Sequence, residues 1–218
     1  MTIKLLRKEL RLFASPLSYF FLLFGILTLA PGYPILLGAF FITFGIFQSF
    51  LAGRENHDTL YTALLPIARR DVVRAKFAFC VLIESCGFLL MLSLTLLRMT
   101  VWKDAAVYRQ NALMNANPLF LGFTLVVFAV FNVVFVGGFF KTSYKYGAPF
   151  IAFIAAAFII TGIAEALHFF PGLHGLNATA LHDAASLWWT TLLGAAVYAI
   201  GTYLSYKISV KRFERVDF

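Results

Sequence analysis

The stretch GRENHDTLYTALLPIARRDVVRAK, residues 53–76, is a polar segment between two apolar runs. It contains five Lys or Arg residues and three acids, and it has a helical pattern of its own. Glu55 and Asp58 stand at the start of that pattern, where acids stabilise a helix N-terminus, and Pro66 ends or kinks the helix. Asp71 lies near the start of a second helix that continues into the next apolar run. A plain connector would not need this much organised sequence, so we interpret the segment as a cytoplasmic docking surface.

The rest of the chain is apolar enough to lie in lipid. Of its 218 residues, 61% are hydrophobic and 13% are charged, whereas soluble domains average about 45–50% and about 25%. Several charge-poor runs reach roughly 20 residues, the length of a helix that crosses about 30 Å of hydrocarbon. The sequence therefore predicts an all-α polytopic membrane protein with a single transmembrane domain, residues 1–218. The six expected spans are residues 17–30, 34–52, 77–97, 118–140, 147–167 and 187–206.

The first expected span is short, because residues 17–30 would measure only about 21 Å as an α-helix. The sequence Pro31-Gly32-Tyr33-Pro34 then forces a turn, since proline cannot continue a helix and glycine permits positive φ. Two interpretations stay open: two full spans, or a shallow hairpin that does not cross. In both, the chain returns to the side from which it started.

The basic residues predict the orientation of the chain, because Lys and Arg gather on the cytoplasmic side of a membrane. With the N-terminus inside, only Arg98, Lys103 and Arg109 of the 18 Lys and Arg residues fall outside. We therefore expect both termini on the cytoplasmic side of the membrane. The same distribution explains the net charge of +8 without nucleic-acid binding. The expected cytoplasmic cations are Lys4, Arg7, Lys8, Arg11, Arg54, Arg69, Arg70, Arg74, Lys76, Lys141, Lys145, Lys207, Lys211, Arg212 and Arg215.

Residues 2–15 form an amphipathic pattern at the start of the chain. Its apolar stripe is Ile3, Leu6, Leu10 and Phe13, and the cations fall largely on the opposite side. Such a helix lies in the membrane interface, with its apolar side in the acyl chains and its cations at the lipid phosphates. We expect this arrangement, and membrane lipids as partners of the helix.

Four polar residues lie inside the expected spans: Gln48, Glu84, Asn132 and Glu165. A carboxylate at the depth of Glu84 must pair, face water or carry a proton. It is therefore either a gate or substrate-path residue, or a structural hydrogen-bonding group. Gln48 and Asn132 are typical of hydrogen bonds between packed helices.

Glu165 and His168 share a helix face, and the loop that follows contains further histidines and an acid. A Glu-x-x-His pair can ligate a metal ion. Only one such pair is present, and the other ligands would come from a loop rich in Gly and Pro. We therefore expect no metal site there.

Two segments carry a family resemblance. They are LLRKELRLF with the following Ser-Pro, within residues 5–16, and LPIARRDVVRAKF, residues 65–77. Together with the six-span topology, they resemble the type-2 class of ATP-binding cassette exporter permeases, in particular the compact permeases of bacterial peptide and bacteriocin exporters. The later spans match this class in hydropathy only.

This resemblance implies an elbow helix at residues 2–15 and a coupling helix at residues 55–65 within a coupling loop, residues 53–76. The coupling helix would sit in a cleft of a separate ATPase subunit, which would hold ATP and Mg²⁺, and two permease copies would form the complex. The chain itself would be no enzyme and would hold no cofactor. Its only Lys-Thr pair, Lys141-Thr142, follows Phe140 where a phosphate-binding loop needs Gly. The implied ATPase-interface residues are Glu55, Asp58, Thr59, Leu60, Ala63, Leu64, Pro66, Arg69 and Arg70.

Three other classes of protein stay open. A proton-driven secondary transporter would use Glu84 or Glu165. A non-transporting immunity or sensor subunit would bind the same ATPase and move nothing. An intramembrane enzyme is disfavoured, because the sequence has neither HExxH nor GxSxG. The cargo, and the choice between a homodimer and a pair of related permeases, cannot be inferred from the sequence.

Overall fold

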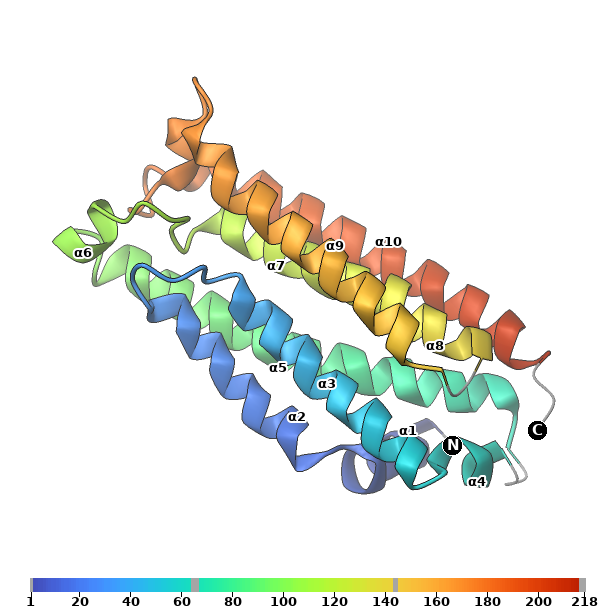
Figure 1. Ribbon diagram of the computed structural model, residues 1–218. Coiled ribbons are helices and arrows are strands. Elements are labelled where there is room, and N and C mark those ends of the chain that lie inside the picture. Colours follow the sequence, from blue (N-terminus) through green and yellow to red (C-terminus); the bar gives the residue numbers. More distant parts are fainter. Residues whose placement is uncertain (1, 64–66, 143–144, 216–218) are drawn as a thin grey trace.

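The computed structural model describes residues 2–63, 67–142 and 145–215 (Figure 1). All regular elements in these ranges are helices, which confirms the all-α class. Long helices run side by side along the molecule, while the first helix lies across its lower end (Figure 1). That end also holds α4 and the last turns of α10, and the opposite end holds α6 (Figure 1).

The chain begins with α1 (Thr2–Lys8) and a wide π-helical turn, η1 (Glu9–Phe13). It then bends by 96° into α2 (Pro16–Phe20) and the 3-10 helix η2 (Phe21–Leu29). The bend follows from the local sequence, because Ser15 caps α2 by accepting a hydrogen bond from the backbone N–H of Leu17 and Pro16 occupies the first turn. The structure thus has a sharp bend between residues 3–13 and the first apolar helix, and we call the segment before the bend, α1 with η1, the elbow.

The first arm of the apolar hairpin, α2 with η2, is longer than an α-helix with the same number of residues. A 3-10 helix rises about 2.0 Å per residue, so α2 and η2 together extend about 26 Å instead of about 21 Å. The returning helix, α3 (Leu37–Glu55), packs closely on it. Ser18 donates a hydrogen bond to the carbonyl of Gly45 at 2.5 Å, and a Cβ on Gly45 would lie 2.7 Å from the Cβ of Phe21. The absence of a side chain at Gly45 is what allows this approach.

The segment at residues 53–76 differs from its expected helix boundaries. Glu55 is the last residue of α3, and His57 reverses the chain with a φ of 52°. The short helix, α4 (Asp58–Ala63), begins at Asp58 instead of residue 55, and residues 64 and 65 of the expected helix lie outside the described residues. The next helix, α5 (Arg69–Thr100), begins before the expected span and contains Asp71 in its first turn.

The second half of the chain follows the expected spans closely. After α6 (Ala106–Arg109), one long helix consists of α7 (Pro118–Val130), the π-helical turn η3 (Phe131–Val136) and α8 (Gly137–Thr142). It is followed by α9 (Gly147–Ala166) with η4 (Leu167–Phe169), then by the short turns η5 (His174–Asn177) and η6 (Ala185–Leu187). The last helix, α10 (Trp188–Phe213), extends beyond its expected end.

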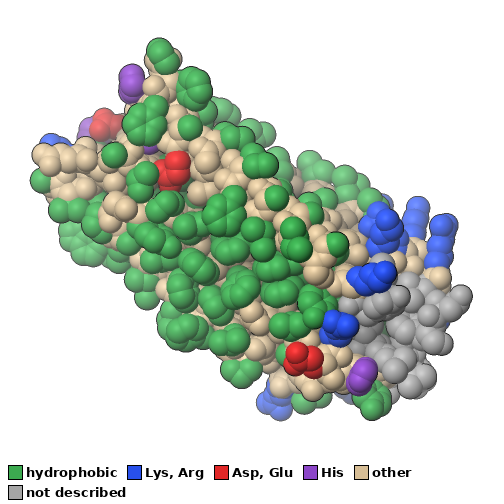
Figure 2. Space-filling model, viewed as in Figure 1, with side chains coloured by type: hydrophobic (Ala, Val, Ile, Leu, Met, Phe, Trp, Pro, Cys, Tyr) green, Lys and Arg blue, Asp and Glu red, His purple; other side chains and the backbone are tan. Residues whose placement is uncertain are grey.

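Five helices in the described residues are long and apolar enough to cross a membrane. They are Leu37–Glu55, Arg69–Thr100, Pro118–Lys141, Gly147–Phe169 and Ala185–Phe213, and a sixth span is reached if Ile3–Phe13 and Pro16–Leu29 are taken as one bent span. Figure 2 shows hydrophobic side chains over the body of the molecule and several Lys and Arg side chains near the end that carries α4. The chain is therefore a multi-pass membrane protein.

Phenylalanine rings join the two halves of the bundle. Phe47 of α3 stacks on Phe150 of α9 with ring centroids 3.6 Å apart, and Phe50 meets Phe135 edge-on at 5.2 Å. Buried rings of this kind form much of the core. This aromatic core encloses the polar clusters that are described next.

Candidate functional site

Four charged side chains join three elements at the lower end of the bundle. We call Lys8, Glu9, Asp58 and Lys76 the α4 ion cluster. The Lys76 Nζ atom of α5 lies 3.0 Å from Glu9 Oε2 and 2.8 Å from Asp58 Oδ2. Lys8 pairs with both acids, at 3.2 Å from Glu9, and donates a hydrogen bond to Thr62 Oγ1 at 2.8 Å. Through these bonds α4 is attached to both the elbow and α5.

The centre of the α4 ion cluster is enclosed. The side chains of Lys76 and Glu9 are 0% and 1% exposed, and the Lys76 ammonium also lies 3.3 Å from the centroid of the Phe13 ring. A charge in such a place is tolerated only when it is paired and hydrogen-bonded. Two cations and two acids make the cluster neutral, so each of its members depends on the others.

Asp58 remains ionised in this setting. Burial raises the pKa of its carboxyl group, but the charges of Lys76 and Lys8 and their hydrogen bonds outweigh burial and bring the pKa below its ordinary value. A carboxyl whose pKa is lower in the folded chain stabilises the fold above its unfolded pKa of about 3.9. This contribution is lost only as the pH falls through the lowered value, so α4 stays attached at neutral and mildly acidic pH.

The residues expected at the ATPase interface differ from one another in exposure and in bonding. Asp58 points into the ion cluster, and Arg69 donates a hydrogen bond to the carbonyl of Glu214 at 3.0 Å. Glu55 and Arg70 are exposed, as is Tyr61, whose exposed fraction is 65%. Leu64 and Pro66, and the side chains of Thr59, Leu60 and Ala63, lie outside what the structure describes.

A second polar cluster lies inside the bundle. Glu84 of α5 is fully buried, and its Oε2 atom accepts hydrogen bonds from Asn132 Nδ2 at 2.9 Å and from the Tyr198 hydroxyl at 2.7 Å. Asn132 also donates to Thr202 Oγ1 at 3.1 Å. We call these four residues the Glu84 cluster. The expectation that Asn132 bonds between helices is met, while Glu84 Oε1 and Asn132 Oδ1 have no hydrogen-bond partner among the described residues.

Glu165 and His168 hold the loop after α6. Glu165 Oε2 accepts a hydrogen bond from the Met114 backbone N–H at 2.7 Å, and His168 Nε2 lies 3.2 Å from the carbonyl oxygen of Ala112. Within the described residues there is no group of three or more potential metal ligands. Gln48 is half-buried on α3.

The combination of an elbow, a short polar helix and long apolar helices covers the whole chain. A family model described as "ABC-2 family transporter protein" matches residues 4–214. The chain belongs to this family. Neither curated proteins nor solved structures gave a match. As a member of the ABC-2 family, the chain is a membrane component of an ABC transporter, and the family implies a partner subunit that binds ATP.

In this ABC-2 protein the sequence did not reveal the ion cluster, although one signal was present. Leu5, Glu9 and Phe13 are spaced four residues apart and are all buried, so an acid lies on the inward stripe of α1 and η1. The stripe expected from the sequence included Ile3, which is 83% exposed. A buried acid usually needs a cation beside it, and in the structure that cation is Lys76.

The opposite end of the ABC-2 protein is held by Arg98, which the sequence assigned to an outer loop. It is buried, and its guanidinium group donates to the carbonyl of Thr28 and to Asn115 Oδ1, both at 2.7 Å. The ring of Tyr108 lies against it at 3.9 Å, and the Tyr108 hydroxyl donates to the carbonyl of Leu29. Arg98 thus joins η2, α5 and the α6 loop.

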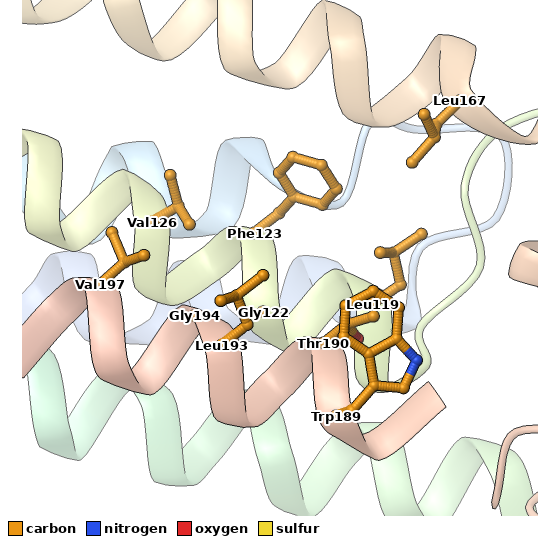
Figure 3. A pocket seen from close by; sticks show the side chains of 10 residues that line it. All are labelled: Leu119, Gly122, Phe123, Val126, Leu167, Trp189, Thr190, Leu193, Gly194 and Val197. Carbon is orange, nitrogen blue, oxygen red and sulfur yellow. The ribbon is translucent and has the colours of Figure 1, made fainter. Parts of the chain in front are cut away.

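An apolar pocket of about 200 Å³ lies between α7, η4 and α10 near the end that carries α6 (Figure 3). Figure 3 shows Gly122 and Gly194 together where α7 and α10 meet. A Cβ on Gly122 would lie 2.6 Å from the carbonyl oxygen of Thr190, so the two helices touch through their backbones. The pocket forms where the helices diverge from this contact, with Trp189 and Leu167 at its edge.

Proposed function

We propose that the chain is the transmembrane subunit of an ABC exporter that moves a peptide or an amphipathic small molecule out of the cell. A separate ATPase subunit, holding ATP and Mg²⁺, supplies the energy. The working complex contains two permease copies, identical or related, with six spans each. Both termini lie on the cytoplasmic side of a bacterial inner membrane. The observation that carries the proposal is the family match over residues 4–214.

In this proposal α4 is the coupling helix. Its inner side is attached to the elbow and α5 by the α4 ion cluster, and its other side carries the exposed ring of Tyr61. A force that the ATPase applies to α4 reaches α5 through the bonds of Lys76. Since α5 also carries Glu84, movement at its lower end reaches the Glu84 cluster.

Replacing Tyr61 with aspartate is expected to lower the amount of ATPase that copurifies with the chain at least tenfold. Tyr61 makes no hydrogen bond to other described side chains, and its ring is exposed, so the change adds a charge at the proposed interface without opening the core. The measurement is affinity purification from native membranes followed by mass spectrometry. Val107→Asp is the matched control, because Val107 is 58% exposed at the opposite end of the molecule.

If the Tyr61 and Val107 variants recover equal amounts of ATPase, α4 is not part of the interface. A wild-type chain that purifies without any nucleotide-binding subunit would overturn the exporter proposal. It would favour a proton-driven transporter, the second candidate function, for which the buried carboxyl of Glu84 is the supporting observation.

Glu84→Gln separates these two functions. Glutamine keeps an oxygen that accepts from Asn132 and Tyr198, so the helices stay connected while the ionisable group is lost. For an ATP-driven exporter we expect transport in membrane vesicles to remain within about twofold of the wild type. If the Glu84→Gln variant still binds the ATPase but no longer transports, the coupling role belongs to Glu84.

A further inference from the structure

A groove of about 400 Å³ lies on the surface between α5 and α10, toward the end of the bundle that holds α4. Phe77 and Val81 line it from α5, and Tyr198, Tyr203 and Tyr206 line it from α10. The Phe77 and Tyr206 rings meet edge-on with centroids 5.8 Å apart. The wall of the groove is therefore mainly aromatic and aliphatic.

The two polar side chains of the inner wall are directed to the Glu84 cluster. The Tyr198 hydroxyl donates to Glu84 Oε2, and Thr202 Oγ1 accepts from Asn132 Nδ2. These bonds leave the phenol ring of Tyr198 and the methyl group of Thr202 as the surfaces available to a ligand. The middle of the groove thus offers contacts to an apolar chain and few to a polar molecule.

Cations lie at the end of the groove nearest the helix termini. Arg74 is exposed and lines the groove. The Lys207 Nζ atom lies 4.7 Å from the centroid of the Tyr203 ring, which is 54% exposed and also lines the groove. In the described part of the chain neither Arg74 nor Lys207 forms a salt bridge. The groove therefore combines an apolar wall with positive charge at one end.

We propose that this groove binds an anionic phospholipid, with the phosphate at Arg74 and Lys207 and one acyl chain against Phe77, Val81 and Tyr203. Arg74 and Val81 are seven residues apart on α5, about 10 Å along its axis, so one side of the groove presents a headgroup cation and a length of apolar wall. Basic side chains beside a membrane attract anionic lipids by about 1 kcal/mol each. Tyrosine rings at the same level suit the boundary between headgroups and acyl chains.

A second copy of the chain fits this groove less well. A twofold interface brings the same patch of both copies together, so Arg74 and Lys207 would face their own equivalents. No acid lines the groove in the described residues to compensate them. A lipid phosphate supplies the missing negative charge. The bound lipid would bridge α5 and α10, the two helices that share Glu84 and Tyr198.

The test uses the full-length chain, purified without partners and placed in phosphatidylcholine vesicles. Tyr203→Trp supplies a fluorescent reporter in the groove, while Trp102, Trp188 and Trp189 lie toward the opposite end of the bundle. Brominated phosphatidylglycerol or brominated phosphatidylcholine is then added as a quencher. We expect the reporter to be quenched by phosphatidylglycerol at about one-thirtieth of the concentration needed with phosphatidylcholine, the ratio that corresponds to about 2 kcal/mol for two cations.

Arg74→Gln in the reporter chain should reduce the ratio of the two quenching concentrations to about fivefold, because Lys207 remains. Arg74→Lys should restore most of the difference. Arg70→Gln, which removes an exposed cation one turn away on the same helix, should keep the preference. Equal quenching by both lipids in the unmodified reporter chain would overturn the proposal. So would an equal loss in the Arg70 and Arg74 variants, because it would assign the preference to general surface charge. Neither result bears on ATPase binding, so the exporter proposal is tested separately.

Discussion

Replacing Lys76 with methionine is expected to lower the free energy of unfolding by about 3–5 kcal/mol, the usual result of removing one partner from a buried ion pair. Methionine fills similar space but leaves Glu9 and Asp58 with only Lys8 as a cation. Glu9 is buried, so its carboxylate would lose its deepest charged partner. The thermal unfolding temperature of the purified chain should fall accordingly. The elbow and α4 should also become more accessible to proteases.

Two further variants test the cause of this loss. Lys4→Met removes an exposed cation from α1, the helix that carries Lys8 of the ion cluster, and should leave stability almost unchanged. Glu9→Gln added to Lys76→Met restores the balance of charge, so the double variant should be more stable than Lys76→Met alone. Purely additive effects in this double-mutant cycle would contradict the idea that the two residues interact directly.

Gly194→Ala is expected to destabilise the chain although alanine favours a helix. The added Cβ would lie 2.5 Å from the carbonyl oxygen of Gly122 and 2.8 Å from its Cα. These are backbone atoms, so α7 and α10 must move apart. Such overpacking costs typically about 1–3 kcal/mol and occasionally more, whereas the gain in helix propensity is at most about 1 kcal/mol. We therefore expect a lower unfolding temperature in detergent.

The matched control lies two turns further along the same helix. A Cβ on Gly201 would meet Val133 Cγ2 at 3.5 Å, an ordinary contact with a side chain. Gly201→Ala should therefore keep or raise the unfolding temperature. A fall of the same size in both variants would refute the specific role of the Gly122–Gly194 contact.

The positions of the membrane helices could be predicted from the sequence because charge-poor runs and proline turns mark their ends. Pro118 and Gly147 begin α7 and α9 as expected. The exceptions have local causes. Glu55 continues α3 because the chain reverses only at His57, and the first hairpin is extended because η2 is a 3-10 helix. Neither feature leaves a signal in hydropathy.

The polar clusters could be predicted only in part. Glu84 and Asn132 stand out because each interrupts an apolar run, but nothing in the sequence pairs them with Tyr198, which lies 66 positions beyond Asn132. Lys76 and Arg98 were counted as cations that set the topology. Their burial follows from the packing of distant segments, since Lys76 meets Glu9 and Arg98 meets Thr28. The interface with a partner stays a prediction, because part of the segment at residues 53–76 lies outside the described residues.

The wide turn η3 changes the phase of the helix from Pro118 to Thr142. A π-helical turn holds one residue more than an α-helical turn, so everything after it is rotated by about 100° relative to an uninterrupted helix. Phe120 and Phe128 before the turn and Phe139 and Phe140 after it are all buried in the core. Deleting one residue within η3 would remove this rotation. The side chains in the second half of the helix would then face the wrong neighbours. The helix thus consists of two halves whose faces are offset by a rotation about the helix axis, and Asn132 lies in the π-helical turn between them.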